Sequence, residues 1–83
     1  MKKKTNKEAE RFTFGVMSNL HGLRLKREIS QEALAQKAGV DRKTVNRIEN
    51  GHFAPSMDTF FRICGALGAN PVDVVRQASK AKK

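Results

Sequence analysis

Five polar side chains near the middle of the chain have the types and the spacing that contact with nucleic acid requires. On a helical wheel they lie on the side opposite the apolar residues or project from the first turn: Arg42, Lys43, Asn46, Arg47 and Asn50. Arginine pairs well with O6 and N7 of guanine, and asparagine pairs well with N6 and N7 of adenine. The pattern also describes an ordinary solvent-exposed helix face, so the face alone does not decide between the two interpretations.

The segment that carries this face is the second of two short helices joined by a tight turn. Ser30 is a suitable N-cap for the first of them, which ends at Gly39, a residue that readily adopts a left-handed conformation. Asp41 is expected to cap the second helix, residues 42–50. Two helices joined by so short a turn must cross steeply, and the small side chain of Ala35 permits the close contact. This spacing is typical of a helix-turn-helix unit, and docking its second helix in the major groove is the usual purpose of that geometry.

Three further helices and no strand complete the expected fold, which is all-α. The first helix is predicted from about Phe12 or Thr13 to Arg27. Ser56 caps a fourth helix that ends at Gly68, and Asn70 caps a fifth helix that begins at Pro71.

The excess of positive charge lies mainly at the two ends of the chain. The 83 residues contain 17 Lys and Arg against 8 Asp and Glu, a formal net charge of +9. We therefore expect a flexible basic tail over residues 1–11, one DNA-binding domain over residues 12–78 and a second basic tail over residues 79–83. An arm that follows a DNA groove is the alternative interpretation of residues 1–11.

Several classes of function have no support in the residues. The single cysteine, Cys64, falls on an apolar stripe and is expected to be a buried, inert thiol. The two histidines lie far apart, and neither a metal-binding spacing nor a nucleophile–base pair can be identified. We expect no catalytic residue, no metal, no cofactor and no membrane span, and a cytoplasmic protein that associates with the nucleoid when bound to DNA.

A longer set of residues resembles a known family. The matching residues are Ser30-Gln31-Glu32-Ala33-Leu34-Ala35, Gly39-Val40-Asp41, Val45, Ile48-Glu49-Asn50-Gly51, Pro55-Ser56-Met57, Phe60 and Leu67-Gly68, with Leu20, Leu23 and Arg24 upstream. They resemble the phage repressor and Cro-like helix-turn-helix family, the xenobiotic-response-element (XRE) type, over about two thirds of the chain. The resemblance implies a five-helix lambda-repressor-like DNA-binding domain with the helix-turn-helix at the second and third helices.

The resemblance also assigns roles to individual residues. Together with the helical wheel, it implies base-reading residues at the start and along the outer face of the third helix: Arg42, Lys43, Thr44, Asn46 and Arg47. It implies contacts with backbone phosphates from Gln31, Asn50, His52 and Phe53. For Asn50, a helix C-cap is the simpler interpretation, and both roles are compatible.

Arg24 and Glu49 are expected to form a structural ion pair between the first and third helices. The resemblance suggests the pairing, and Glu49 falls near the inner side of the wheel, where a lone charge is costly. Two exposed charges of little energetic consequence are the alternative.

The expected function is sequence-specific binding of double-stranded DNA by a homodimer. Such a protein would act as a repressor or autoregulator of transcription at a palindromic operator. Leftover apolar residues suggest a dimer interface at Phe61, Val72 and Val75. The alternative is a protein-binding use of the fold, as an antitoxin or coactivator module, with a toxin or RNA polymerase as further candidate partners.

Overall fold

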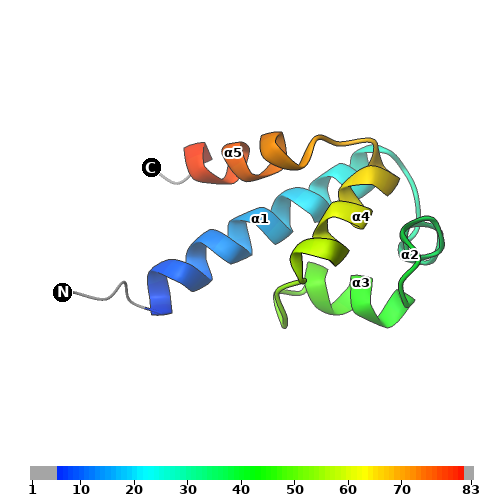
Figure 1. Cartoon of the computed structure of the whole chain (residues 1–83), viewed down its shortest axis with the longest axis horizontal. Helices are drawn as coiled ribbons and strands as arrows, with labels where there is room; N and C mark the ends of the chain where they lie inside the picture. Colours follow the sequence, from blue (N-terminus) through cyan, green and yellow to red (C-terminus); the bar gives the residue numbers. More distant parts are fainter. Residues whose placement is uncertain (1–5, 82–83) are drawn as a thin grey trace.

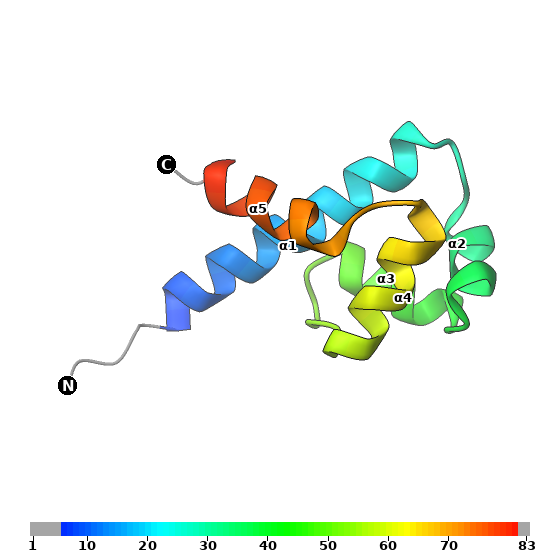
Figure 2. The ribbon, with the colours of Figure 1, turned by 45° about the horizontal axis from the view of Figure 1, so that its top comes forward.

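The computed structural model describes residues 6–81, and five helices make up the fold of these residues (Figure 1). They are α1 (Asn6–Lys26), α2 (Gln31–Ala38), α3 (Arg42–Glu49), α4 (Met57–Leu67) and α5 (Pro71–Ala81). Helix α5 packs along α1, while α2, α3 and α4 gather around the other part of α1 (Figure 1). The N-terminal turns of α1 project beyond this group of helices in both views (Figure 2). The expected all-α, five-helix architecture is confirmed, and no strand occurs within residues 6–81.

The two outer helix boundaries differ from the expected ones. Helix α1 begins at Asn6 rather than near Phe12, so part of the segment expected to be a flexible tail is helical. Helix α5 continues to Ala81, into the expected C-terminal tail. After Asn6, the first turns of α1 consist of Lys, Glu, Ala and Arg, which favour a helix although they show no apolar periodicity. Residues 1–5 and 82–83, the remainder of the expected tails, lie outside the described residues.

Side chains predicted to cap the helices do so at three of four positions. The hydroxyl of Ser30 accepts a hydrogen bond from the backbone N–H of Ala33 at 3.0 Å, and Ser56 caps α4 in the same way. The side-chain oxygen of Asn70 accepts from the N–H of Val72 at 2.8 Å. Asp41 occupies the N-cap position of α3 but its side chain forms no capping hydrogen bond. Three of the helix starts are therefore encoded locally.

The core lies where α1, α2, α3 and α4 meet. Its most completely buried side chains are Leu34, Val45, Ile48, Ile63, Cys64 and Leu67. The inner side chains of α1 and α5 extend this core, through Leu20 and Val74 among others. Because α2 and α3 have only eight residues each, their stability depends on this shared packing. None of the five described helices combines the length and the apolar composition that crossing a membrane requires.

Burial protects the thiol of Cys64, whose pKa is raised to about 11 by the loss of solvation. We expect the folded chain to react with iodoacetamide at mildly alkaline pH at least about a hundredfold more slowly than the urea-unfolded chain, because the thiolate is the nucleophile. Mass spectrometry of the alkylated fraction over time measures the two rates. Equal rates in the folded and unfolded chains would contradict the burial of this thiol.

Candidate nucleic-acid interface

The outer face of α3 presents most of the residues expected to read bases. Arg42, Lys43 and Arg47 are exposed, while Thr44 and Asn46 are half-buried. The opposite side of the helix is fully buried through Val45 and Ile48. The structure thus brings the five expected base-reading side chains onto one short helix with a fixed inner side. We call this set, Arg42, Lys43, Thr44, Asn46 and Arg47, the α3 face.

Three of the residues expected at the DNA backbone, Asn50, His52 and Phe53, lie just after the C-terminus of α3 and are exposed. The N–H of His52 donates to the carbonyl of Arg47 at 2.9 Å, which turns the chain sharply at the end of the helix. The guanidinium carbon of Arg47 lies 5.8 Å from the centre of the Phe53 ring, a cation–π distance. Arg47 and Phe53 therefore limit each other's positions at one end of the α3 face.

The same loop rests against α1 through Gly51. Its φ angle is +74°, a left-handed conformation that suits glycine. A Cβ atom at this position would lie 2.9 Å from two ring carbons of Phe14 on α1. The sequence indicated Gly51 only as a helix stop. The approach of Phe14, which is distant in the sequence, had no signal in the local pattern.

Arg24 and Glu49 form a two-pronged ion pair between α1 and α3. Nε of Arg24 lies 2.6 Å from Oε2 of Glu49, and Nη2 lies 2.9 Å from Oε1. The third nitrogen of Arg24 donates to the carbonyl of Ile29 at 2.9 Å. The side chain of Arg24 is 11% exposed and that of Glu49 is 4% exposed. The alternative of two exposed charges therefore does not describe this pair.

The pKa of each partner reflects this environment. Burial alone would raise the pKa of Glu49, but hydrogen bonds from Arg24, Gln31 and His21 more than offset it and hold that pKa below its ordinary value. The hydrogen bond to Glu49 raises the pKa of Arg24. The pair is therefore fully ionised at neutral pH.

Two more side chains reach the Glu49 carboxylate. Nδ1 of His21 lies 2.8 Å from Oε1, and Nε2 of Gln31 donates to the same oxygen at 3.1 Å. Gln31, expected at a DNA phosphate, also accepts a hydrogen bond from Nδ2 of Asn46 at 3.3 Å. Asn46 in turn accepts from Nδ2 of Asn50 at 3.2 Å. No local pattern in the sequence indicated that His21 takes part or that these amides are connected.

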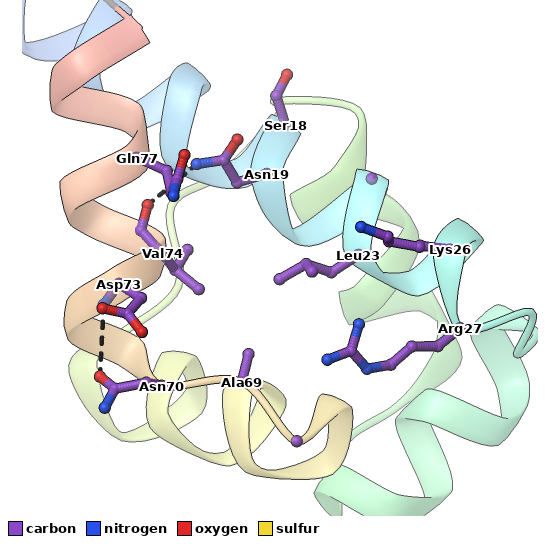
Figure 3. A pocket seen from close by; sticks show the side chains of 12 residues that line it. Ser18, Asn19, Leu23, Lys26, Arg27, Ala69, Asn70, Asp73, Val74 and Gln77 are labelled. Atoms are coloured by element: carbon purple, nitrogen blue, oxygen red, sulfur yellow. Dashed lines mark hydrogen bonds between the residues drawn. The ribbon is translucent and has the colours of Figure 1, made fainter.

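A hollow lies between α1 and α5, on the side of α1 away from α3 (Figure 3). It has a volume of about 580 Å³ and is open to solvent. Several of its polar groups bond to each other: Asn19 donates to the carbonyl of Val74 at 3.0 Å, and the N–H of Asp73 donates to Asn70 at 3.4 Å (Figure 3). No group of His, Cys, Asp and Glu able to hold a metal ion occurs among the described residues.

Comparison with known proteins identifies the family. A profile of the helix-turn-helix family matches residues 20–74, which include the whole of α2, α3 and α4. The chain belongs to the XRE-type helix-turn-helix family, a family of DNA-binding transcriptional regulators and not of enzymes. The resemblance expected from the sequence is confirmed.

Two relatives show the extent of the similarity. An uncharacterized HTH-type transcriptional regulator from Methanothermobacter thermautotrophicus is 38% identical over 45 residues, which cover 54% of this chain and 65% of the relative. The chain thus matches slightly less than two thirds of that relative. The HTH-type transcriptional regulator YgzD of Bacillus subtilis is 40% identical over 52 residues, or 63% of this chain and 79% of the relative.

Solved structures share the fold over most of the chain. The restriction-modification controller protein C.AhdI from Aeromonas hydrophila is 32% identical, with a TM-score of 0.70 over 80% of this chain and 93% of that protein. The clp gene regulator ClgR from C. glutamicum has a TM-score of 0.79 over 87% of this chain and 94% of its own. Its sequence identity is 22%, so this likeness supports the lambda-repressor-like fold alone.

We expect Arg24→Met to lower the free energy of unfolding by about 3–5 kcal/mol, because it leaves the buried Glu49 carboxylate without its main counter-charge. Urea unfolding at neutral pH, followed by circular dichroism, measures the change. Arg76→Met is the matched control: Arg76 pairs with Asp73 at 2.8 Å, but both side chains are more than half exposed. It should cost at most about 1 kcal/mol.

Acid should remove the contribution of the Arg24–Glu49 pair. Because the folded pKa of Glu49 lies below its ordinary value, the stabilisation is present above that ordinary value and is lost as the pH falls through the folded pKa. The difference between the wild type and Arg24→Met should therefore shrink in acid. Equal costs for Arg24→Met and Arg76→Met at neutral pH would contradict the structural role of the pair.

Proposed function

We propose that this chain binds double-stranded DNA sequence-specifically, with α3 in the major groove. The main observation that supports this proposal is that Arg42, Lys43 and Arg47 are exposed on a helix whose other side is buried in the core. Arginine side chains in this position can form paired hydrogen bonds with guanine. The net charge of +9 favours approach to the phosphate backbone.

The backbone contacts proposed beside the α3 face are those of Gln31, Asn50, His52 and Phe53. Gln31 is the first residue of α2, and a helix N-terminus presents N–H groups that suit a phosphate oxygen. Asn50 is the C-cap of α3, and the exposed residues His52 and Phe53 follow it. Gln31 contacts Asn46 and Glu49, and the other three residues follow the C-terminus of α3, so phosphate contacts there would help to determine how α3 sits in the groove.

The chain is proposed to act as a homodimer on a palindromic operator, as a repressor or autoregulator. One recognition helix covers only about four or five base pairs, too few for useful specificity, and a two-fold dimer doubles the site. Apolar side chains on α4 and α5 supply a candidate interface: Phe61 is 65% exposed and Val72 is 60% exposed. Val75 is half-buried and lines an apolar hollow of about 240 Å³ with Phe12 and Met57.

A protein partner is the second candidate function, and the same apolar surface favours it. Met57 is 82% exposed, an unusual exposure for a large apolar side chain at the start of a helix. A toxin or RNA polymerase that covered this surface would make the chain an antitoxin or a coactivator module. Weak DNA binding that a protein partner strengthens would distinguish this function from the first.

Arg42→Ala and Arg47→Ala should each weaken binding to the specific site by about 1–3 kcal/mol and have little effect on random DNA. Titration of both duplexes at the same salt concentration, followed by fluorescence anisotropy, measures the losses. Arg27→Ala is the matched control because Arg27 lines the hollow on the side of α1 away from α3 (Figure 3). Equal losses on both DNAs would show that the arginines contact phosphates and do not read bases.

Selection from a random duplex pool should enrich a palindrome whose half-sites lie about ten base pairs apart, one turn of DNA. Phe61→Ser should shift the chain toward a monomer in sedimentation equilibrium and abolish selection of the paired half-sites, because it removes exposed apolar area from the interface. A single unpaired half-site, or a wild-type monomer at micromolar concentration, would contradict the homodimer.

A further inference from the structure

A continuous chain of hydrogen bonds runs from the buried Glu49 carboxylate through Gln31 and Asn46 to Asn50, the C-cap of α3. An ionised carboxylate can only accept hydrogen bonds, so each group that faces it must present a donor. Gln31 therefore turns its NH2 group toward Glu49, at 3.1 Å, and its oxygen away from it. The reverse orientation would place two oxygens against each other.

The orientation of the Gln31 amide determines the orientation of the next two amides, those of Asn46 and Asn50. The oxygen of Gln31 faces Asn46, so Asn46 presents its NH2 group there, at 3.3 Å. The oxygen of Asn46 then faces Asn50, which presents its own NH2 group at 3.2 Å. An amide has a donor at one end and an acceptor at the other, so reversing Gln31 or Asn46 would break the chain on both sides. Gln31, Asn46 and Asn50 are called the amide chain below.

In this orientation, Asn46 keeps one N–H and one oxygen lone pair that take no part in the amide chain. Its NH2 group lies on the α2 side and its oxygen lies on the Asn50 side of the α3 face. Adenine recognition requires the NH2 group to donate to N7 and the oxygen to accept from N6. A fixed amide therefore fits adenine in only one of the two orientations of an A·T base pair.

We propose that Glu49 is a specificity-determining positioning residue, which fixes the direction of the Asn46 amide through Gln31 and so sets which orientation of an A·T pair α3 prefers. The proposal rests on the proposed function, since it requires α3 in the major groove. Glu49 itself touches no DNA in this account. Its effect on base preference is separate from its part in the Arg24 ion pair.

Gln31→Met tests this without disturbing the ion pair. Methionine has a similar length and no amide, so the hydrogen bonds of Gln31 to Glu49 and Asn46 are lost, while the two bonds between Arg24 and Glu49 remain. Gln36→Met is the matched control, because Gln36 is an exposed glutamine elsewhere on α2. Substituting Glu49 itself would be a poorer test, because the folded chain depends on it.

The first readout is the side-chain amide spectrum of the free protein, by nitrogen–proton correlation NMR. Gln31→Met should move the Asn46 and Asn50 NH2 signals toward those of solvent-exposed amides, and Gln36→Met should leave them in place. Unchanged Asn46 signals in Gln31→Met would overturn the proposal, since the direction of Asn46 would then not depend on Gln31. This readout needs no DNA and stands apart from the proposed function.

The second readout is binding to duplexes in which each A·T pair of the selected half-site is reversed in turn. The wild type and Gln36→Met should discriminate the two orientations at one position by roughly 5- to 150-fold, as one paired amide contact does. Gln31→Met should bring that ratio close to one, whatever its loss of overall affinity. A ratio kept in Gln31→Met, or no such position in the wild type, would overturn the proposal. A wild type that selects no sequence refutes the proposed function and the base-reading step, while the amide spectra still decide the direction of the amide chain.

Discussion

The arrangement of the first three helices depends on the hydrogen bonds that the buried carboxylate of Glu49 accepts. The carboxylate accepts hydrogen bonds from Arg24 on α1 and Gln31 on α2, while its own backbone belongs to α3. A carboxylate that is 4% exposed is costly unless it is fully paired. The arrangement that pairs it is the arrangement that packs Val45 and Ile48 into the core, so electrostatics and apolar packing favour the same geometry.

This constraint matters because the helix-turn-helix is built from very short pieces. Helices α2 and α3 have eight residues each, too few to be stable in isolation. Two further contacts hold the same C-terminal end of α3: the close approach of Gly51 to Phe14, and the position of Arg47 over the Phe53 ring. The rigid inner side of α3 lets its outer side chains remain exposed without destabilising the fold.

Local patterns predicted much of this structure. Ser30, Ser56 and Asn70 mark helix starts because a capping hydrogen bond joins residues only two or three positions apart. The start of α1 was misplaced because its first turns are exposed and carry no apolar period. The position of Phe14 against Gly51 and the entry of His21 into the Glu49 cluster join distant residues, and no local spacing encodes them. The α3 face was predictable as a surface, whereas the hydrogen bonds that orient its amides were not.

Membership of the XRE-type family and the geometry of α3 support one account, in which a network centred on Glu49 presents a rigid helix to DNA. The most direct measurement is a crystal structure of the chain with its selected duplex. We expect α3 to lie in the major groove, with Arg42 and Arg47 at base edges and the Arg24–Glu49 distances unchanged. DNA bound against another surface, such as the hollow between α1 and α5, or an ion pair broken on binding, would contradict it.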